Sequence, residues 1–390
     1  MPVASDSADE PAAIHCDAII VGAGPAGCFA AMRLHAVGLH AIVLQRNGVV
    51  RSRPESLPPR IAQPLLTLGL WQEFLDWTVQ SSCRRSSGIV SMWGSQTAAE
   101  TNYYFDPYGT GWHIDRQEFD GFVHRAARAR GCRFVPYQRI VRAAPPSDGA
   151  GWRLLVQTDS GPVTIQTQFV IDAGGRGAPF ARDLGTQRVI DDPQVAMLSP
   201  LRLIDPCAEQ RLVLESTQHG WWYRVPVTDG ESMAGFVTDA DILPRESAAQ
   251  LDFLLSEWNC LQLVSNVGDM AVVPDFELGT IVPATCTRLV PGHGDNWMAV
   301  GDSALSADPL SGQGLLIACV EGIRGAQVIS ERIAGRHESA DAGQSALEEE
   351  RSQYLQERQR MFDLEKRWPT AAFWQRRHRS QPDVGTFTQE

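Results

Sequence analysis

The sequence lacks the features of a membrane-spanning or nucleic-acid-binding protein. No apolar run reaches the ~18 residues that a spanning helix needs. The formal net charge is -12, whereas nucleic acids and anionic membranes attract basic surfaces. We therefore expect neither a membrane span nor a nucleic-acid partner.

Cysteine patterns typical of a disulfide framework or a metal site are also missing. None of the eight cysteines belongs to a C-x-x-C pair or a Cys/His metal spacing, so no metal site is expected. Scattered thiols in a chain of 390 residues favour the reducing cytoplasm. Residues 1–15 lack the basic and apolar regions of a secretory signal, and we expect them to form a short disordered tail.

The order of the predicted elements indicates an α/β fold. The segment CDAIIVGAGPAGCFAAMRLHAVGLHAIVLQRN predicts a strand, a glycine-rich turn, a helix and a second strand. The expected elements are strands at 18–21 and 41–45, helices at 25–36, 56–75 and 116–130, a hairpin over 151–177, several strands over 197–237 and a long helix from 312. The stretch GRHESADAGQS is expected to be a linker before a charged helix.

This order predicts a discontinuous nucleotide-binding domain with an inserted antiparallel-sheet domain. The nucleotide-binding domain is expected in 16–75, 111–195 and 290–335, and the inserted domain in 76–110 and 196–289. Residues 336–390 are expected to form a C-terminal helical segment.

Gly22, Gly24 and Gly27 form a G-x-G-x-x-G motif between the first strand and the first helix. The first glycine allows a tight turn, the second lets a pyrophosphate approach the backbone, and the third lets the helix pack against the strand. The diphosphate then lies at the helix N-terminus. Ala26, inside the same motif, is a further candidate contact.

The second strand ends with Gln45 and Arg46, where an acidic residue usually accepts hydrogen bonds from ribose hydroxyls. The Gln45 amide can still bond a hydroxyl, although without charge assistance. Arg46 either approaches the adenosine end or is solvated.

Two later motifs distinguish FAD from NAD. FVIDAGGRGAPFARDLG places Asp172 at the end of an apolar strand, where its carboxylate can accept a hydrogen bond from a hydroxyl of the dinucleotide. AVGDSALSADPLSGQG supplies a glycine-rich loop that opens a helix toward the flavin pyrimidine. Its candidate cofactor residues are Gly301, Asp302, Pro309, Gly312, Gln313 and Gly314.

These motifs resemble the superfamily of FAD-dependent aromatic hydroxylases and tryptophan halogenases over almost the whole chain. The resemblance implies a Rossmann-like FAD-binding domain of the aromatic hydroxylase / glutathione reductase type, with an inserted substrate domain and C-terminal helices. Arg116, in GWHIDR, matches the arginine that helps to hold the flavin. Because one dinucleotide fingerprint is present, NAD(P)H or a separate flavin reductase supplies the electrons, and both sources stay open.

The tryptophan halogenases share part of the pattern but differ at the positions that handle halide. GWWYRVPV resembles their W-x-W-x-I-P signature, with Tyr223 in place of the second tryptophan. Their relay lysine should fall near SSCRRSSGIVSMWG, which contains arginines and no lysine, and a guanidinium cannot easily form a haloamine. The loop DPLSGQG also lacks their glutamate and threonine, so halogenation is disfavoured.

The combination RPESLPP, SMWG, GWHIDR, DPLSGQG and EKRWPTAAFWQRR most resembles the flavoproteins that mature cysteine tryptophylquinone enzymes. It implies hydroxylation of an electron-rich ring, such as a tryptophan within a partner protein, with O2 as co-substrate and through a flavin C4a-hydroperoxide. The alternatives are a small-molecule aromatic hydroxylase or halogenase of a biosynthetic pathway, a reductase of the geranylgeranyl-reductase type, and a non-catalytic flavoprotein.

Aromatic residues provide the candidate substrate wall. On a strand, Trp221 and Tyr223 share one face, where they either stack on a substrate or pack the sheet, and Trp93 is a third candidate. Glu55 and His113 are the candidate acid/base groups. The segment EKRWPTAAFWQRRHRS either docks a protein substrate or packs on the body as a cap.

Overall fold

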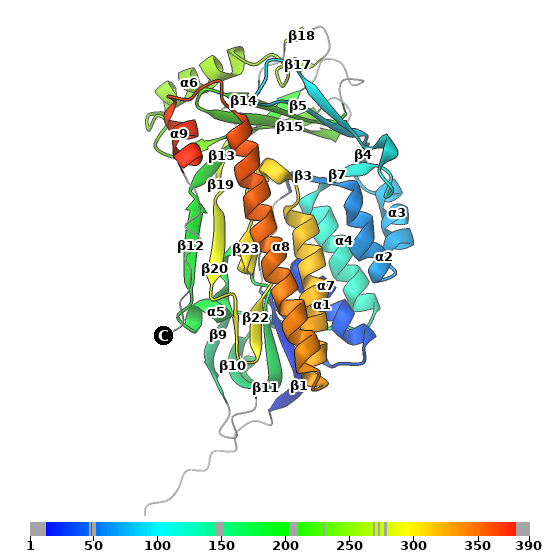
Figure 1. Cartoon of the computed structure of the whole chain (residues 1–390). Helices are drawn as coiled ribbons and strands as arrows, with labels where there is room; N and C mark the ends of the chain where they lie inside the picture. Colours follow the sequence, from blue (N-terminus) through cyan, green and yellow to red (C-terminus); the bar gives the residue numbers. More distant parts are fainter. Residues whose placement is uncertain are drawn as a thin grey trace, which may run out of the picture.

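The computed structural model describes residues 13–46, 48, 52–145, 151–202, 210–228, 231–267, 270–271, 274–276 and 279–379 (Figure 1). Residues 1–12 of the tail predicted over 1–15 lie outside this range. The last two residues of that predicted tail instead belong to the first strand, which begins at Ile14.

One sheet forms the base of the nucleotide-binding half. Its order is β21 (His293–Gly294), β22 (Trp297–Ala299), β11 (Gly161–Asp172), β1 (Ile14–Val21), β2 (Ala41–Arg46) and β8 (Arg133–Tyr137). The strands from β22 to β8 run parallel. Residues Ala18 to Val21 of β1 are fully buried, as expected for a parallel strand covered on both faces. The strand β10 (Trp152–Thr158) pairs antiparallel with β11, and β9 (Arg139–Ala144) pairs antiparallel with β10.

Three helices stand beside this sheet, α1 (Pro25–Ala36), α4 (Arg116–Ala129) and α7 (Gly314–Ile333) (Figure 1). The bounds of α1 are those that the sequence predicted. Cys28, Phe29 and Met32 of α1 share a core with Phe119 of α4 and Cys319 of α7. The helices therefore hold the glycine-rich turn before α1 rigidly against the strands.

A second, seven-stranded sheet forms the substrate half. Its order is β19 (Thr280–Pro283), β13 (Gln194–Arg202), β16 (Glu231–Asp239), β15 (Gly220–Thr228), β14 (Leu212–Thr217), β5 (Gly88–Met92) and β6 (Ala99–Asn102). Alternation along β15 sends Trp221 and Tyr223 to one face and Trp222 to the other. The Trp222 face is covered by α6 (Ser247–Asn259) through Leu254 and Trp258.

The remaining strands and α-helices outside the C-terminal segment are short. They are β3 (Pro54–Leu57), α2 (Ala62–Thr67), α3 (Trp71–Gln80), β4 (Arg84–Ser86), β7 (Gly111–Asp115), α5 (Pro179–Asp183), β12 (Gln187–Asp192), β17 (Asn266–Val267), β18 (Met270–Ala271), β20 (Cys286–Val290) and β23 (Leu305–Ser306). The prediction of one helix over 56–75 was wrong at its start and in its middle. Residues 56–57 belong to β3, and Gly69, at φ +65°, separates α2 from α3.

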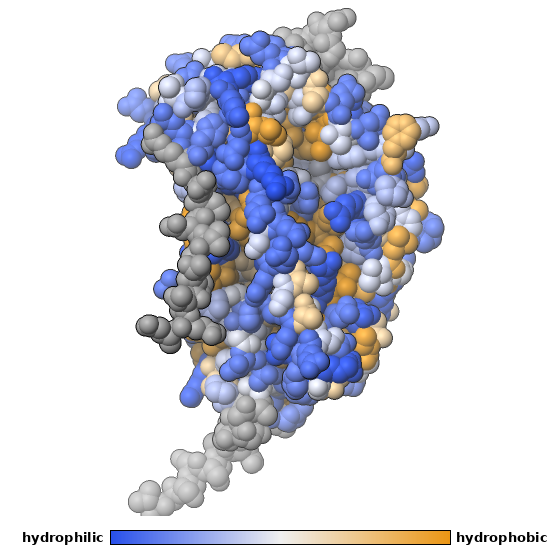
Figure 2. Space-filling view, in the orientation of Figure 1, coloured by the Kyte–Doolittle hydropathy of each residue, from blue (hydrophilic) through white to orange (hydrophobic). Residues whose placement is uncertain are grey.

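The predicted linker at 335–345 is also wrong from His337 onward, because α8 (His337–Leu364) begins there. Its buried residues Ala340 and Leu347 pack on the core of the nucleotide-binding half. Figure 1 shows α8 running beside α7 and reaching the second sheet, where α9 (Ala372–Arg379) follows. The outward face of α8 is hydrophilic (Figure 2). None of the helices in the described ranges combines the length and apolar composition needed to span a bilayer.

The C-terminal aromatics pack as a cap on the second sheet. Phe373 and Trp374 are fully buried in the core that contains Trp221, and the Trp374 Nε1–H donates to the Thr217 carbonyl at 2.8 Å. Arg377 pairs with Asp192 and Asp239. These side chains are used inside the molecule, which favours the cap over the docking segment.

Candidate functional site

A cavity of about 940 Å³ lies where the two halves meet. Its floor is built from the turns that follow β1, β2, β11 and β22, four parallel strands of one sheet. Carboxyl ends of parallel strands meet at one edge, which is where α/β folds bind nucleotides. The roof of the cavity is formed by β13, β14 and β15 of the second sheet.

The glycine-rich turn has the geometry that a dinucleotide diphosphate requires. Gly22 adopts φ +114°, and a Cβ there would overlap the carbonyl of Ala173. A Cβ on Gly27 would overlap the carbonyl oxygen of Gly22, so α1 packs directly on the turn. Gly24 lines the cavity, and a Cβ there would meet nothing within 4 Å. The space beside Gly24 is therefore open to a ligand.

The end of β2 supplies one wall of the cavity. Gln45 and Arg46 both line it, together with Tyr137 of β8. The Gln45 Oε1 lies 3.1 Å from the Nε2 of His124, another cavity residue. Gln45 is thus held in place from α4, and Arg46 is exposed at the rim.

Asp172 is buried and stabilises the turn after β11 from outside the cavity, whereas the sequence predicted a direct contact with the cofactor. It is fully buried, and its carboxylate accepts hydrogen bonds from the backbone N–H of Gly174, Phe180 and Ala181 at 2.9–3.0 Å. The Ser303 hydroxyl donates to it at 3.1 Å. With these partners, Asp172 fixes the turn after β11 and does not line the cavity.

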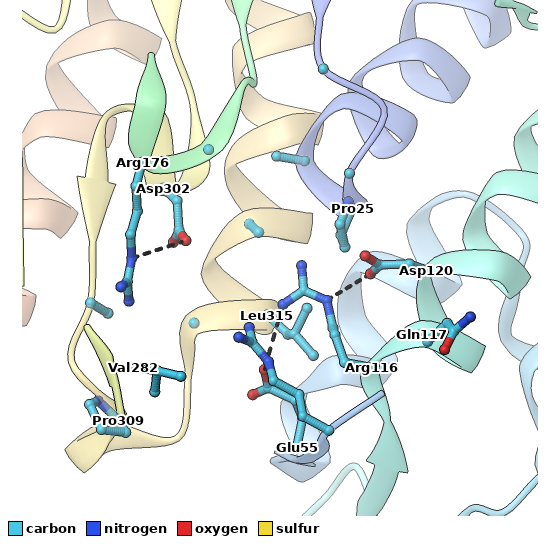
Figure 3. A pocket seen from close by; sticks show the side chains of 18 of the residues that line it. Pro25, Glu55, Arg116, Gln117, Asp120, Arg176, Val282, Asp302, Pro309 and Leu315 are labelled. Atoms are coloured by element: carbon cyan, nitrogen blue, oxygen red, sulfur yellow. Dashed lines mark hydrogen bonds and ion pairs between the residues drawn. The ribbon is translucent and has the colours of Figure 1, made fainter. Parts of the chain in front are cut away.

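Asp302 lies inside the cavity, where its carboxylate is 4.0 Å from the Nε of Arg176 (Figure 3). Burial raises the pKa of Asp302, and the positive charges of Arg176 and Arg116 act against that rise. Gly301, by contrast, is buried, and its N–H donates to Glu321 at 2.6 Å. Of this predicted pair, Asp302 can reach a ligand and Gly301 shapes the backbone.

The segment 301–314, here called the flavin loop, carries the remaining predicted cofactor residues. Pro309, Gly312 and Gly314 line the cavity, and α7 begins at Gly314. Gln313 is exposed and does not line it. The N-terminus of a 20-residue helix thus faces the cavity beside glycines that leave its N–H groups accessible.

Four charged side chains form a cluster on one side of the cavity (Figure 3). Arg116 donates to Asp120 at 2.8 Å, and its Nη1 lies 3.6 Å from Glu55. Glu55 also accepts from Arg53 at 3.0 Å. Burial alone would lower the pKa of Arg116, but Asp120 and Glu55 raise it. The guanidinium therefore stays charged, and the two carboxylates hold it in position over the cavity.

The roof of the cavity is apolar. It is lined by Ala196, Leu198, Leu212, Leu214, Tyr223 and Val225. Burial raises the pKa of the Tyr223 phenol, with a further contribution from Glu55, so the phenol stays neutral. A flat apolar surface opposite the flavin loop suits an aromatic ring.

Trp221 and Trp93 lie away from this roof. Trp221 is fully buried, and its ring centroid is 6.1 Å from that of Trp93. The Trp93 Nε1–H donates to the Met361 carbonyl at 2.6 Å. Neither lines the cavity, and both pack the sheet against the C-terminal helices. Of the three predicted substrate-wall residues, the structure brings Tyr223 alone to the cavity.

His113 does not line the cavity, but it lies directly behind Ser56, which does. Both its ring nitrogens are engaged, Nδ1 with the Ser56 hydroxyl and Nε2 with the Gln210 carbonyl, each at 2.9 Å. Burial lowers the pKa of His113 to about 4, with a smaller contribution from Arg224. Glu55 does line the cavity, so the two predicted acid/base candidates lie in different environments.

Several cavity residues were not predicted from the sequence. Asp120, His124, Arg176 and Tyr137 all line it. Asp120 follows Arg116 by four residues on a predicted helix, a spacing that brings two side chains together and could have indicated the pair. Arg176 belongs to the glycine-rich motif after β11 that the sequence singled out, whereas His124 and Tyr137 reach the cavity through packing between distant segments, which left no local signal.

Together, the open Gly24, the helix N-terminus at Gly314 and the charged Arg116 suit an elongated anionic dinucleotide, so the residues fit FAD. The fold and the site define a dinucleotide-binding flavoprotein. A family model described as FAD binding domain matches residues 15–340, and the chain belongs to this family. It is an enzyme family of FAD-dependent oxidoreductases.

Similar proteins cover nearly the whole chain. LodB of Marinomonas mediterranea, an FAD-dependent oxidoreductase by name, is 27% identical over an alignment of 375 residues that covers 93% of this chain and 96% of LodB. The flavin-dependent halogenase CmlS is 25% identical with a TM-score of 0.78, covering 96% of this chain and 69% of CmlS. QhpG, a peptidyl tryptophan dihydroxylase, is 21% identical with a TM-score of 0.72, covering 96% of this chain and 81% of QhpG.

Proposed function

We propose that this protein is an FAD-dependent monooxygenase that hydroxylates an electron-rich aromatic ring, and that the ring belongs to a tryptophan of a partner protein. The observation that carries the proposal is the apolar roof formed by Leu212, Leu214 and Tyr223 opposite the flavin loop. A ring held between the apolar roof and the flavin loop would lie beside the flavin and away from bulk water.

The absence of a relay lysine from the cavity favours hydroxylation over halogenation. The chain has one lysine, Lys366, and it is exposed on the C-terminal segment. No lysine is found among the described residues that line the cavity. An arginine there stays protonated and is a poor acceptor of an electrophilic halogen.

The chain's own residues would bind the ring, exclude water and hold charge, whereas bound FAD, once reduced, supplies two electrons for the activation of O2. One oxygen atom enters the ring, the replaced ring hydrogen leaves as a proton, and the other oxygen atom leaves as water. The apolar roof excludes solvent that would divert the oxidant. Among the carboxylates that line the cavity, which include Asp120 and Asp302, we assign the uptake of that proton to Glu55, which lies between Arg53 and Arg116.

The choice of a peptidyl tryptophan rests on the motifs shared with flavoproteins of quinone cofactor biogenesis. The likeness in fold to the peptidyl tryptophan dihydroxylase QhpG makes this substrate the first to test. We further propose NAD(P)H or a separate reductase as the electron donor, and the cytoplasm as the place of action.

The test uses the FAD-loaded protein, reduced without O2 and then exposed to air with a set of tryptophan peptides and the product of the adjacent gene. Mass spectrometry should find a gain of one or two oxygen atoms on a tryptophan. Parallel reactions contain bromide, free aromatic compounds or a prenyl chain. Incorporation of halide, or saturation of the prenyl chain, without any ring oxygenation would refute the proposal.

A further inference from the structure

The buried face of α8 is directed at the flavin loop, although α8 itself does not line the cavity. Arg351, Tyr354 and Arg358 follow one another at intervals of three and four residues, which places them on one side of a helix. The Tyr354 hydroxyl lies 3.4 Å from Asp308, and both arginines are largely buried. The helix thus contacts the loop at Asp308, which lines the cavity, although no described residue of α8 does.

Arg358 binds the carboxylate at the centre of the flavin loop. Its Nε donates to Asp308, whose side chain is 1% exposed. Asp308 in turn accepts the N–H of Leu310 at 3.2 Å and caps the turn Pro309–Ser311 that precedes Gly312. The other branch of the guanidinium donates to Asp192, at the end of β12.

Arg351 makes the equivalent contact at the start of the loop. Its Nε and Nη2 donate to the two oxygens of Glu321 at 2.8 and 2.9 Å. Glu321 accepts the N–H of Gly301 at 2.6 Å, and Arg351 also donates to the Ala299 carbonyl at 3.2 Å. The start and the centre of the flavin loop therefore each have an arginine, a buried carboxylate and a backbone N–H in series.

We propose that α8 positions the flavin loop through these two arginines, and that Arg358 and Arg351 are positioning residues for bound FAD. A buried carboxylate that loses its partner must acquire water or a proton, and it then holds a backbone N–H less firmly. Displacement of Asp308 or Gly301 would move Pro309, Gly312 and Asp302, which line the cavity. The proposal rests on FAD binding, a property of the family, and is independent of the proposed hydroxylation.

Arg377 offers a matched control. It is 4% exposed, and it shares the Asp192 carboxylate with Arg358. Its other carboxylate partner is Asp239 on β16, and it has no hydrogen bond to Asp308 among the described contacts. Substitution of either Arg377 or Arg358 should therefore disturb the same buried network. Only substitution of Arg358 should also displace the flavin loop.

The experiment compares Arg358→Lys with Arg377→Lys in the full chain. A lysine keeps the charge, but its ammonium cannot span two carboxylates as the guanidinium fork does. Thermal unfolding reports the loss of stability. Titration of the FAD-free protein, followed by flavin fluorescence, reports FAD affinity, and the absorption spectrum and midpoint potential of the bound flavin report its surroundings.

We expect both variants to unfold at a lower temperature. Arg358→Lys should also weaken FAD binding about tenfold, a loss of about 1.4 kcal/mol, and change the flavin spectrum and potential, whereas Arg377→Lys leaves affinity within about twofold. Equal losses of FAD affinity in the two variants, or an unchanged affinity in Arg358→Lys, would overturn the proposal. If Arg358→Lys does not fold, Arg351→Lys provides the same test at Gly301, and an unchanged affinity and spectrum there also overturn it.

Discussion

The ring of Tyr223 lies directly over Gly235, its partner on the neighbouring strand β16. A Cβ on Gly235 would overlap the ring and lie 2.7 Å from the phenol oxygen. The glycine therefore lets the ring lie flat on the sheet, and the apolar roof keeps its shape because no side chain lifts Tyr223 into the cavity.

The first prediction concerns this pair. Gly235→Ala should push the Tyr223 ring toward the cavity and lower kcat/KM for the aromatic substrate at least about tenfold. Overpacking should also cost about 1–3 kcal/mol of stability. FAD affinity, measured by fluorescence, should stay within about twofold of the original. Tyr223→Phe, which keeps the ring flat, is the control, and equal losses in both variants would contradict the steric explanation.

A second prediction separates the roles of two glycines in the first turn. Gly24→Ala should fold normally, because its Cβ meets nothing within 4 Å, yet it should weaken FAD binding at least about tenfold, because that space is where the diphosphate approaches. Gly27→Ala should instead lower the unfolding temperature, because its Cβ overlaps the Gly22 carbonyl. A Gly24→Ala protein that binds FAD normally would argue against this place for the diphosphate.

Stability should depend on pH through His113. Burial lowers its pKa from the ordinary value of 6.5 to about 4, so between pH 4 and 6.5 the unfolded chain binds a proton that the folded chain does not. The free energy of unfolding is therefore highest above pH 6.5, where His113 is neutral in both states. It falls by on the order of 3 kcal/mol as the pH falls toward 4. Denaturant unfolding at several pH values between 4 and 7 measures how the free energy of unfolding changes with pH.

The control for this pH dependence is His113→Gln, whose amide does not titrate. Its unfolding free energy should change less between pH 6.5 and 4 than that of the original protein. The pH profile of turnover should be the same in both, because His113 does not line the cavity. A shifted turnover profile in His113→Gln would restore His113 as an acid/base candidate.

A lysine-free protein tests the proposed chemistry directly. Lys366→Arg removes the one lysine of the chain, and Lys366 is exposed outside the cavity. Oxygenation, measured by mass spectrometry, should be unchanged within about twofold, because a surface Lys-to-Arg exchange perturbs little. Loss of the reaction in Lys366→Arg, in a protein that still binds FAD, would show that a lysine takes part after all.

The C-terminal cap gives a prediction on stability. Trp374 is fully buried and stacks with Trp368, which is only partly buried. Trp374→Ala should therefore cost about 3–5 kcal/mol of unfolding free energy, and Trp368→Ala clearly less. If Trp374→Ala left stability unchanged but prevented reaction with a protein substrate, the segment would be a docking element instead of a cap.

The sequence by itself determined the turn of Gly22, Gly24 and Gly27, the bounds of α1 and the FAD-binding fold. These features depend on local rules, since a glycine at a tight turn and a helix N-terminus facing a diphosphate have the same signature in any chain. The alternation of Trp221 and Tyr223 across β15 is equally local, because successive strand residues point to opposite faces.

Tertiary structure alone decided which side chains reach the cavity. Asp172 and Trp221 carry the right chemistry, yet packing buries both, the first among backbone N–H groups and the second beside Trp93 in the core of the C-terminal cap. The stretch 335–345 was predicted to be a linker, but a helix forms from His337 because Ala340 and Leu347 are buried against a distant core. Helix propensity and strand alternation act over a few residues, whereas burial depends on segments that are hundreds of residues apart.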